Sequence, residues 1–217
     1  YEGLVSGDFR PLDARSVGGI LKRGGTILLT SRSKRFMEPS GQRDAVRKMN
    51  EAGMDALIVI GGEGSMNGAH ALSQKGVKVV GIPGSIDNDL WGTNMAIGTD
   101  TAMNTIMDAV DKLRDTASSH QRAFLVETMG RNCGYLAVMA GIACGAEMVL
   151  IPEVPFTEDE VAAAVEDAYQ RGKTHAIIIN AEGSVISTTD LAAKIDGMDL
   201  GFKTRMTILG HIQRGGS

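Results

Sequence analysis

The sequence has few of the residues that mark secreted, disulfide-stapled or membrane proteins. Its 217 residues include two cysteines, Cys133 and Cys144, whose spacing fits no metal site, and we interpret both as reduced core thiols of a cytosolic protein. No apolar run approaches the roughly 20 residues of a membrane span, and no signal peptide is visible. The composition therefore predicts a cytoplasmic protein without a membrane partner.

Aromatic residues and surplus positive charge are scarce too. Aromatics make up 4% of the chain and the formal net charge is -4, so the chain lacks the stacking platforms and the basic excess of nucleic-acid-binding proteins. We therefore expect no nucleic-acid partner. An initiator Met is also missing, and both ends, Tyr1 and Gly215–Ser217, look like cuts in a longer protein, so we expect a fragment.

What the chain does contain is a regular alternation of apolar runs and helical periodicity, with many of its 28 glycines next to the apolar runs. We predict strands at residues 26–30, 56–60, 77–82, 123–127, 148–151, 176–179 and 206–209. We predict helices at 13–22, 40–53, 65–72, 99–114, 157–172 and 190–195 and one ending near Cys144, with a polar turn at 118–122. This pattern predicts a doubly wound α/β fold that divides near Gly98, where the chain has crossed one sheet.

The stretch Pro83–Asp89 directly follows the predicted strand 77–82. A strand, a tight Gly turn and then carboxylates put Asp87 and Asp89 at the carboxyl end of a parallel strand, where ligands of open α/β sheets bind. Two carboxylates there can activate a hydroxyl as general base and hold a divalent cation. A solvated turn is the other interpretation, since Asn, Asp, Gly and Pro are the usual turn residues.

A glycine-rich loop, Gly61–Ser65, comes straight after the predicted strand 56–60 and opens a helix. Such a loop presents free backbone N–H groups and the positive end of a helix dipole to a phosphate. Charged residues elsewhere in the chain also follow strands, and they should gather on one face: Arg32, Asp87, Asp89, Arg122, Arg131, Glu182, Arg205, His211 and Arg214. Many cations beside two carboxylates and a phosphate loop are typical of phosphoryl transfer onto an anionic substrate.

Five ordered motifs resemble those of the 6-phosphofructokinase family, and they extend over nearly the whole chain. Gly61–Ser65 is similar to the ATP loop of that family, and Pro83–Asp89 is similar to its catalytic motif. The motifs that bind fructose 6-phosphate in the family have counterparts at Ser119–Arg122, Met129–Arg131 and Gly210–Gly216.

The resemblance implies a glycolytic, cytoplasmic enzyme that transfers a phosphoryl group from ATP, with Mg²⁺, to the 1-hydroxyl of fructose 6-phosphate. It implies two Rossmann-like doubly wound sheets, one in an incomplete ATP-binding domain at residues 1–98 and one in a sugar-phosphate-binding domain at 99–217, whose chain returns toward the first near 212–217. Arg122 and Arg205 match arginines that the family supplies from a neighbouring subunit. We therefore expect a homo-oligomer, a dimer or tetramer, with shared active sites.

The same resemblance implies roles residue by residue. Asp87 would take the proton from the sugar hydroxyl, Asp89 would support it and the Mg²⁺, and Arg131 would stabilise charge on the transferring phosphoryl group. The residues matched to the sugar-phosphate site are Ser85, Ile86, Arg122, Met129, Gly130, Glu182, Arg205, His211, Ile212, Gln213 and Arg214. The residues matched to the nucleotide site are Tyr1, Arg32, Gly61, Gly62, Glu63, Gly64, Ser65 and Gly68, with Glu63 nearest the metal.

Glu63 is the main departure from the family pattern, which has Asp there. One extra methylene moves the carboxylate by about 1 Å, and a misplacement of that size can cost roughly 100-fold in rate. Gly64 and Gly84 match enzymes that use ATP rather than pyrophosphate. A pyrophosphate-dependent enzyme and a non-catalytic regulatory half of the family, with Glu63 marking decay, stay open as alternatives. An NAD-kinase-like enzyme would leave Pro83–Asp89 unexplained.

An allosteric site is also implied. In the family a nucleoside diphosphate or phosphoenolpyruvate binds between subunits to residues that match Arg114, Gly145, Glu147, Arg171, Lys173 and His175. Ala14 and Arg15 replace two residues of the bacterial pocket. A set of surface charges with a cation cluster at a helix C-terminus is the alternative interpretation.

Overall fold

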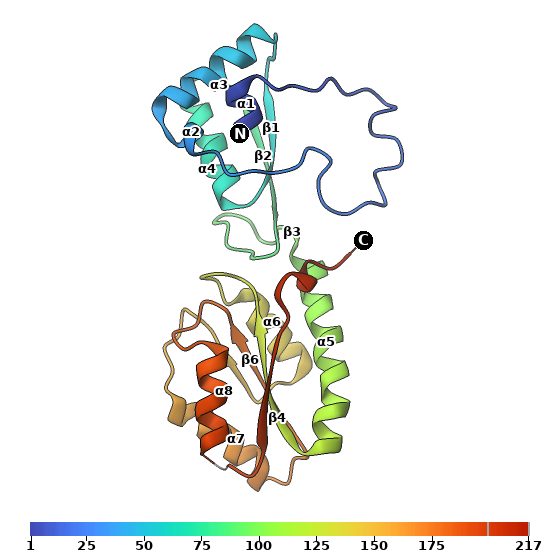
Figure 1. Ribbon diagram of the computed structural model, residues 1–217, viewed down its shortest axis with the longest axis vertical. Coiled ribbons are helices and arrows are strands. Elements are labelled where there is room, and N and C mark those ends of the chain that lie inside the picture. Colours follow the sequence, from blue (N-terminus) through green and yellow to red (C-terminus); the bar gives the residue numbers. More distant parts are fainter. Residues whose placement is uncertain (199, 217) are drawn as a thin grey trace. The chain divides into compact units, whose positions relative to one another are not determined.

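Parallel strands alternate with helices along the chain in the structure, a computed structural model that describes residues 1–198 and 200–216. The predicted α/β class is therefore confirmed. The chain forms two units: unit 1 comprises Tyr1–Gly84 and Gly216, and unit 2 comprises Ser85–Gly215 (Figure 1). The predicted domain division near Gly98 stays a prediction. The last residue of the predicted second domain, Ser217, lies outside the described residues.

Unit 1 is a small parallel sheet with helices on one face. Its elements are α1 (Glu2–Ser6), α2 (Lys34–Met37), α3 (Pro39–Glu51), β1 (Leu57–Gly61), α4 (Glu63–Ser73) and β2 (Val79–Ser85), whose last residue begins unit 2. β1 and β2 pair in parallel from Leu57 opposite Val79 to Gly61 opposite Pro83. One core cluster joins all four helices through Val5, Phe36, Ala45 and Leu72. The other face of the two strands carries exposed apolar side chains, Ile58, Ile60 and Val80.

The predicted helix at 13–22 and the predicted strand at 26–30 are wrong. Residues 8–33 form irregular backbone, in which the backbone–backbone hydrogen bonds of the segment close turns from residue i to residue i+3. Leu21 and Leu28 are 96% and 70% exposed, and Leu29 has a φ of 59°, which no regular strand adopts. An apolar run forms a strand only where a neighbouring strand completes its hydrogen bonds, and among the described residues this run has no such neighbour.

Unit 2 is a four-stranded parallel sheet between two layers of helices. Its elements are β3 (Ile97–Gly98), α5 (Thr99–His120), β4 (Arg122–Thr128), α6 (Tyr135–Cys144), β5 (Met148–Leu150), α7 (Glu158–Gln170), β6 (Ala176–Ala181), α8 (Thr188–Gly197), β7 (Lys203–Ile208) and the 3₁₀ helix η1 (Gly210–Arg214). The strand order in the four-stranded sheet is β5-β6-β4-β7. All of its pairings are parallel.

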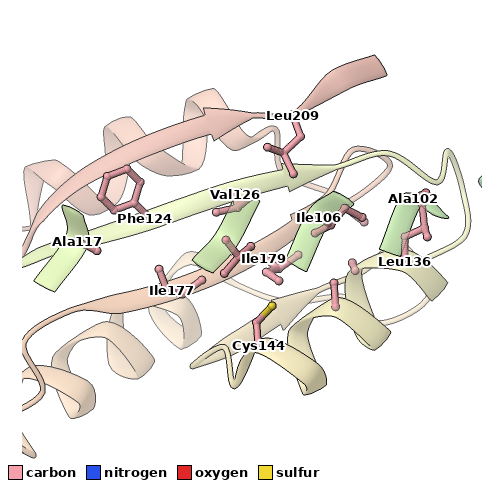
Figure 2. Packing of buried hydrophobic residues seen from close by; sticks show 14 residues of the cluster. Ala102, Ile106, Ala117, Phe124, Val126, Leu136, Cys144, Ile177, Ile179 and Leu209 are labelled. Carbon is pink, nitrogen blue, oxygen red and sulfur yellow. The ribbon is translucent and has the colours of Figure 1, made fainter. Parts of the chain in front are cut away.

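Two core clusters lie on opposite faces of this sheet. Phe124 and Val126 of β4 and alternate residues of β6 pack with α5 and α6 (Figure 2). Leu125 of β4 and Ile178 of β6 point the other way and pack with α7 and α8. Because side chains alternate along a strand, an unbroken apolar run such as 123–126 supplies both layers. The two clusters hold the sheet between the helix layers, and the polar motifs follow directly after its strands.

The other predicted strands are present, with ends shifted by up to three residues, and so are the other predicted helices. The predicted polar turn at 118–122 is wrong in part. Helix α5 continues to His120, and only Gln121, with a φ of 50°, forms the left-handed cap. Helix α7 begins with a capping box formed by Thr157 and Glu160. Within residues 1–198 and 200–216, no helix is long and apolar enough to cross a membrane.

Candidate active site

The loop after β2 places Asp87 in a fixed position within unit 2. Ser85 Oγ accepts the N–H of Asp87 at 3.2 Å, and Thr99 Oγ1 donates to the carbonyl of Ser85 at 3.1 Å. Asn88 has a left-handed φ of 55°, and its Oδ1 accepts the N–H of Ala96 at 2.9 Å. A turn whose side chains are merely solvated needs no such hydrogen bonds. These bonds therefore hold the carboxylates of the loop in a fixed orientation.

The loop after β4 brings a cation to Asp87. Arg131 has a φ of 51° and follows Gly130, whose φ is 134°. This turn lets the Arg131 Nε approach Asp87 Oδ2 to 3.3 Å, and the N–H of Arg131 donates to Glu182 Oε1 at 2.9 Å. Three strand ends, those of β2, β4 and β6, thus contribute one charged group each. The structure brings together the predicted residues Ser85, Asp87, Arg131 and Glu182.

Asp87 is the buried charge of this group. It is 6% exposed, whereas the side chain of Arg131 is 65% exposed. Burial raises the pKa of Asp87, the positive charge of Arg131 lowers it, and the negative charges of Asp89 and Glu182 raise it further. The net effect is a carboxylate with a higher pKa than an exposed Asp, and hence a stronger base.

Asp89 has the character of a cation ligand. Its Oδ1 is buried and accepts no hydrogen bond within the described part of the chain. A buried carboxylate oxygen left without a donor is suited to an ion, and Mg²⁺ is usually held by one or two carboxylates together with substrate phosphates. Among residues 1–198 and 200–216, no group of three or more His, Cys, Asp or Glu side chains could hold a metal. The residues therefore fit a Mg²⁺ that arrives with a phosphate ligand, and they do not form a complete protein cage.

The segment after β7 adds polar side chains near the loop that carries Arg131. His211, Ile212 and Arg214 of η1 are exposed. Gln213 is fully buried, and its Oε1 accepts the N–H of Met129 at 3.0 Å. The predicted sugar-phosphate residues of this motif thus divide into three that face outward and one that faces inward.

Arg122 and Arg205 lie elsewhere in unit 2. Arg122 is the first residue of β4, at the opposite end of that strand from Met129–Arg131. Arg205 is an exposed residue of the edge strand β7, opposite Phe124 of β4. The structure does not bring these two predicted residues to Asp87, so the expectation that the charged residues gather on one face is wrong for Arg122 and Arg205.

Within unit 1 the predicted nucleotide residues lie around the start of α4, apart from Arg32. The Tyr1 hydroxyl donates to the carbonyl of Ser65 at 2.5 Å, and a Cβ on Gly68 would come within 2.5 Å of the Tyr1 ring. Burial raises the pKa of Tyr1 to about 12. The helix begins at Glu63 with Gly62 as an N-cap without a side-chain hydrogen bond, which suits a phosphate. Arg32 lies in the exposed segment 8–33.

The predicted effector residues lie mostly at the amino end of β6. Glu147 has a side chain 4% exposed, pairs with Lys173 Nζ at 2.6 Å and accepts the N–H of Ile177. His175 Nδ1 is 2.8 Å from Ser118 Oγ, and burial lowers the pKa of His175. Arg114 donates to the carbonyl of Cys144, the residue before Gly145. Arg171, the residue that caps α7, instead pairs with Asp167 of that helix at 2.6 Å.

Sequence reasoning missed the side chains that brace these loops. Glu153 Oε1 accepts the N–H of Gly134 at 2.8 Å, next to the loop that carries Arg131. Asn88 braces the loop of the aspartates, as described above. The preference of Asn for left-handed backbone could have indicated the second, whereas nothing in the local pattern at Glu153 indicates a contact 19 residues away.

The fold and this group of residues define a member of an α/β family of phosphotransferases. The family model described as "Phosphofructokinase" matches residues 1–217, and the chain belongs to this family. It is 51% identical over 217 residues to ATP-dependent 6-phosphofructokinase 1 of Clostridium perfringens, covering all of this chain and 67% of that protein. It is 49% identical to ATP-dependent 6-phosphofructokinase of Thermotoga neapolitana, covering 68% of that protein.

A solved structure supports the same assignment. The chain superposes on Pichia pastoris phosphofructokinase in the T-state with a TM-score of 0.92 and 38% identity, covering all of this chain and 26% of that one. The chain therefore spans about two thirds of the length of the curated relatives and about a quarter of the yeast chain. The predicted family and the predicted phosphofructokinase-type fold are confirmed.

Proposed function

We propose that this chain carries the sugar-phosphate site and part of the nucleotide site of an ATP-dependent 6-phosphofructokinase. This enzyme transfers a phosphoryl group from ATP to the 1-hydroxyl of D-fructose 6-phosphate, giving fructose 1,6-bisphosphate and ADP. The observation that supports it best is the pair of Asp87 and Arg131, a buried carboxylate held 3.3 Å from an exposed guanidinium. A base beside a cation suits a hydroxyl that must lose its proton while it meets an anionic phosphoryl group.

The side chains of unit 2 divide this work. Asp87 accepts the proton of the 1-hydroxyl, the sugar oxygen bonds to the γ-phosphorus, and the bond from that phosphorus to the oxygen of ADP breaks. The raised pKa of Asp87 strengthens it as a base, and the positive charge of Arg131 favours its ionised form. Because Arg131 is largely exposed, its guanidinium can also contact the phosphoryl oxygens whose charge grows during transfer.

The remaining residues of the proposed sugar-phosphate site position the acceptor. Glu182 is exposed, so its second carboxylate oxygen can accept a hydrogen bond from a sugar hydroxyl. His211 and Arg214, on η1, are exposed cations or donors suited to the 6-phosphate. Ser85, Ile86, Met129, Gly130 and Ile212 complete the proposed lining.

The proposed nucleotide site is the start of α4 in unit 1. Gly61, Gly62, Gly64 and Ser65 would receive the phosphates, with Tyr1, Arg32 and Gly68 around them and Glu63 toward the metal. Asp89 would hold a Mg²⁺ that neutralises phosphate charge, and Glu63 stays the metal residue that the resemblance assigns to the nucleotide site. We also propose the domain assignment predicted above, with an ATP-binding domain at 1–98 and a sugar-phosphate-binding domain at 99–217.

Assembly, regulation and location belong to the same proposal. Arg122 and Arg205 would act in the site of a neighbouring subunit of a homodimer or homotetramer in the cytoplasm. The group at the amino end of β6 would bind an anionic effector, through Arg114, Lys173 and His175 together with Gly145, Glu147 and Arg171. The contacts of Glu147 with Lys173 and Ile177 mean that an effector would have to compete with an existing ion pair.

Two alternatives differ from this proposal, one in the phosphoryl donor that the enzyme uses and the other in having no catalytic turnover. Pyrophosphate dependence is disfavoured by Gly64 and Gly84, which leave room for a nucleotide. A non-catalytic half is favoured only by Glu63 in place of Asp.

The proposal is tested with the protein that contains this chain, by measuring ADP release with fructose 6-phosphate and ATP, then with pyrophosphate as donor. Asp87→Asn should lower kcat by about 100- to 10,000-fold, the usual contribution of a general base. Asp108→Asn is the matched control, because this exposed carboxylate on α5 pairs with Lys112 on the same helix. Full activity of Asp87→Asn would contradict the assigned base. Turnover with pyrophosphate alone would establish the first alternative, and binding of the sugar phosphate without turnover would establish the second.

A further inference from the structure

Gln213 differs from its neighbours in η1, because it alone among His211, Ile212, Gln213 and Arg214 is buried. Its exposed fraction is 0%, and it is one of the largest fully buried side chains of the described chain. A buried amide is costly unless both its N–H₂ and its C=O find partners. The contacts of this amide therefore show what the side chain does.

Both groups of the Gln213 amide are used, and they join two segments. Oε1 accepts the N–H of Met129 at 3.0 Å, from the loop after β4. Nε2 donates to the carbonyl of Gly210 at 3.0 Å, at the start of η1. Met129 is two residues before Arg131, so this amide holds the loop that carries the guanidinium facing Asp87.

Each end of that loop is thereby held by one side chain. The N–H of Met129 is held by Gln213, and the N–H of Arg131 is held by Glu182 at 2.9 Å. Between them lies Gly130, where the backbone takes a φ of 134°. Glycine adopts positive φ without strain, but Arg131, with a φ of 51°, is a non-glycine residue in the left-handed region, and such strained backbone persists only where its surroundings hold it.

The segment from which Gln213 reaches out is itself anchored. The N–H of Leu209 donates to the carbonyl of Glu127 at 3.3 Å, and Leu209 packs in the core cluster of α5 and α6. At the other end, a Cβ on Gly215 would lie 2.4 Å from Thr105 Oγ1, so the backbone runs against α5. Gln213 therefore connects a fixed segment to a loop that needs support.

We propose that Gln213 is a positioning residue, which fixes the Met129–Arg131 loop against η1 and so aligns Arg131 with Asp87 and with the sugar-phosphate residues of η1. In this role Gln213 supports the site from behind the loop, whereas its motif implies a direct contact with the substrate. The kinetic effect that we expect rests on the proposed function. The structural role rests on the two hydrogen bonds alone.

The chemistry of the amide allows a sharp test. Gln213→Met keeps length and apolar bulk but loses both hydrogen bonds. Gln213→Glu keeps the acceptor for Met129, but when ionised it sets a second oxygen against the carbonyl of Gly210. When protonated, the Glu can again donate to Gly210 and accept from Met129. Thr188→Val is the matched control, since it removes another buried side-chain hydrogen bond of unit 2, from Asn180 of β6 at 2.8 Å, and Thr188 lies at the start of α8, outside the Met129–Arg131 loop and η1.

The experiment measures kcat, KM for fructose 6-phosphate, melting temperature and amide hydrogen exchange in the protein that contains this chain. Gln213→Met should lower kcat/KM by roughly 10- to 100-fold, as expected for misplacement of a catalytic group by about 1 Å, and should speed exchange at Met129. Thr188→Val should lower the melting temperature without changing kcat/KM. Gln213→Glu should regain activity as the pH falls, relative to wild type at the same pH.

Either of two results would overturn the inference: equal kinetic effects of Gln213→Met and Thr188→Val, or a Gln213→Glu variant whose pH profile parallels wild type. An inactive wild-type protein would refute the proposed function instead. In that case exchange at Met129 still decides whether Gln213 holds the loop, because that readout needs no turnover.

Discussion

Gly183 offers a way to move the Arg131 loop without altering any charged group. It follows Glu182 directly, after the end of β6. A Cβ at this position would lie 1.9 Å from the carbonyl oxygen of Arg131 and 3.1 Å from Cγ of Pro152. Real Cβ atoms essentially never come closer than 3.0 Å to such an atom, so Gly183→Ala must push the two backbones apart by about 1 Å.

That displacement acts on the geometry of the proposed site. It separates Arg131 from Glu182, stretching the 2.9 Å hydrogen bond between them, and it redirects the guanidinium that lies 3.3 Å from Asp87. Since about 1 Å of misplacement can cost roughly 100-fold in rate, we expect kcat/KM to fall about 100-fold. The measurement is ADP release at several concentrations of fructose 6-phosphate, with melting temperature recorded for the same samples.

Gly197→Ala is the matched control for this experiment. Gly197 is the last residue of α8, and a Cβ there has no heavy atom within 4 Å. Alanine is a better helix former by about 1 kcal/mol, so this variant should keep full activity and equal or higher stability. If Gly183→Ala retained activity within about threefold of wild type, the loop would tolerate displacement, and the reasoning from its two clamps would be refuted.

Three further predictions concern charge and helix capping. Burial raises the folded-state pKa of Asp87 above its unfolded value, so the ionised carboxylate costs stability at pH values above that folded pKa. Asp87→Asn should therefore raise the melting temperature near neutral pH. This gain should vanish toward about pH 3, where the Asp87 side chain is neutral like that of Asn. Glu182 raises the pKa of Asp87 and Arg131 lowers it, so Glu182→Gln should shift the acid limb of kcat/KM to lower pH and Arg131→Gln to higher pH, and shifts of the same sign would contradict this electrostatic balance. Thr157→Ala should cost about 1 kcal/mol of unfolding free energy by removing the capping box of α7, with activity unchanged, which denaturant titration would measure.

The two central strands of unit 2, β4 and β6, were predictable because each is buried on both faces. The run at 123–126 is continuously apolar, and that at 176–179 is too, which is the pattern of a parallel strand between two helix layers. The same reasoning failed for the segment 8–33. Thr26–Thr30 has the composition of a strand, but composition does not reveal whether a neighbouring strand exists to bond with it.

The candidate site was predictable only at the level of its charged groups. Motifs after strand ends indicated Asp87, Arg131 and Glu182, because parallel strands end at a common edge. They did not indicate which motif residues face inward. Gln213 and Arg214 are neighbours in the sequence, yet one is buried and the other exposed, and that difference arises from η1 packing on α5, a tertiary contact that no local pattern encodes.

The strength of Asp87 as the proposed base depends on how firmly the loops around it are held. Burial alone would favour the protonated form, which cannot accept a proton, and Arg131 alone would favour an ionised form that is a weak base. A useful base needs both effects in balance, and the balance changes steeply with the distance between the two charges. The backbone clamps at Met129 and Arg131 therefore do more than stabilise a turn: by holding the guanidinium 3.3 Å from the carboxylate, they set the pKa at which Asp87 can work.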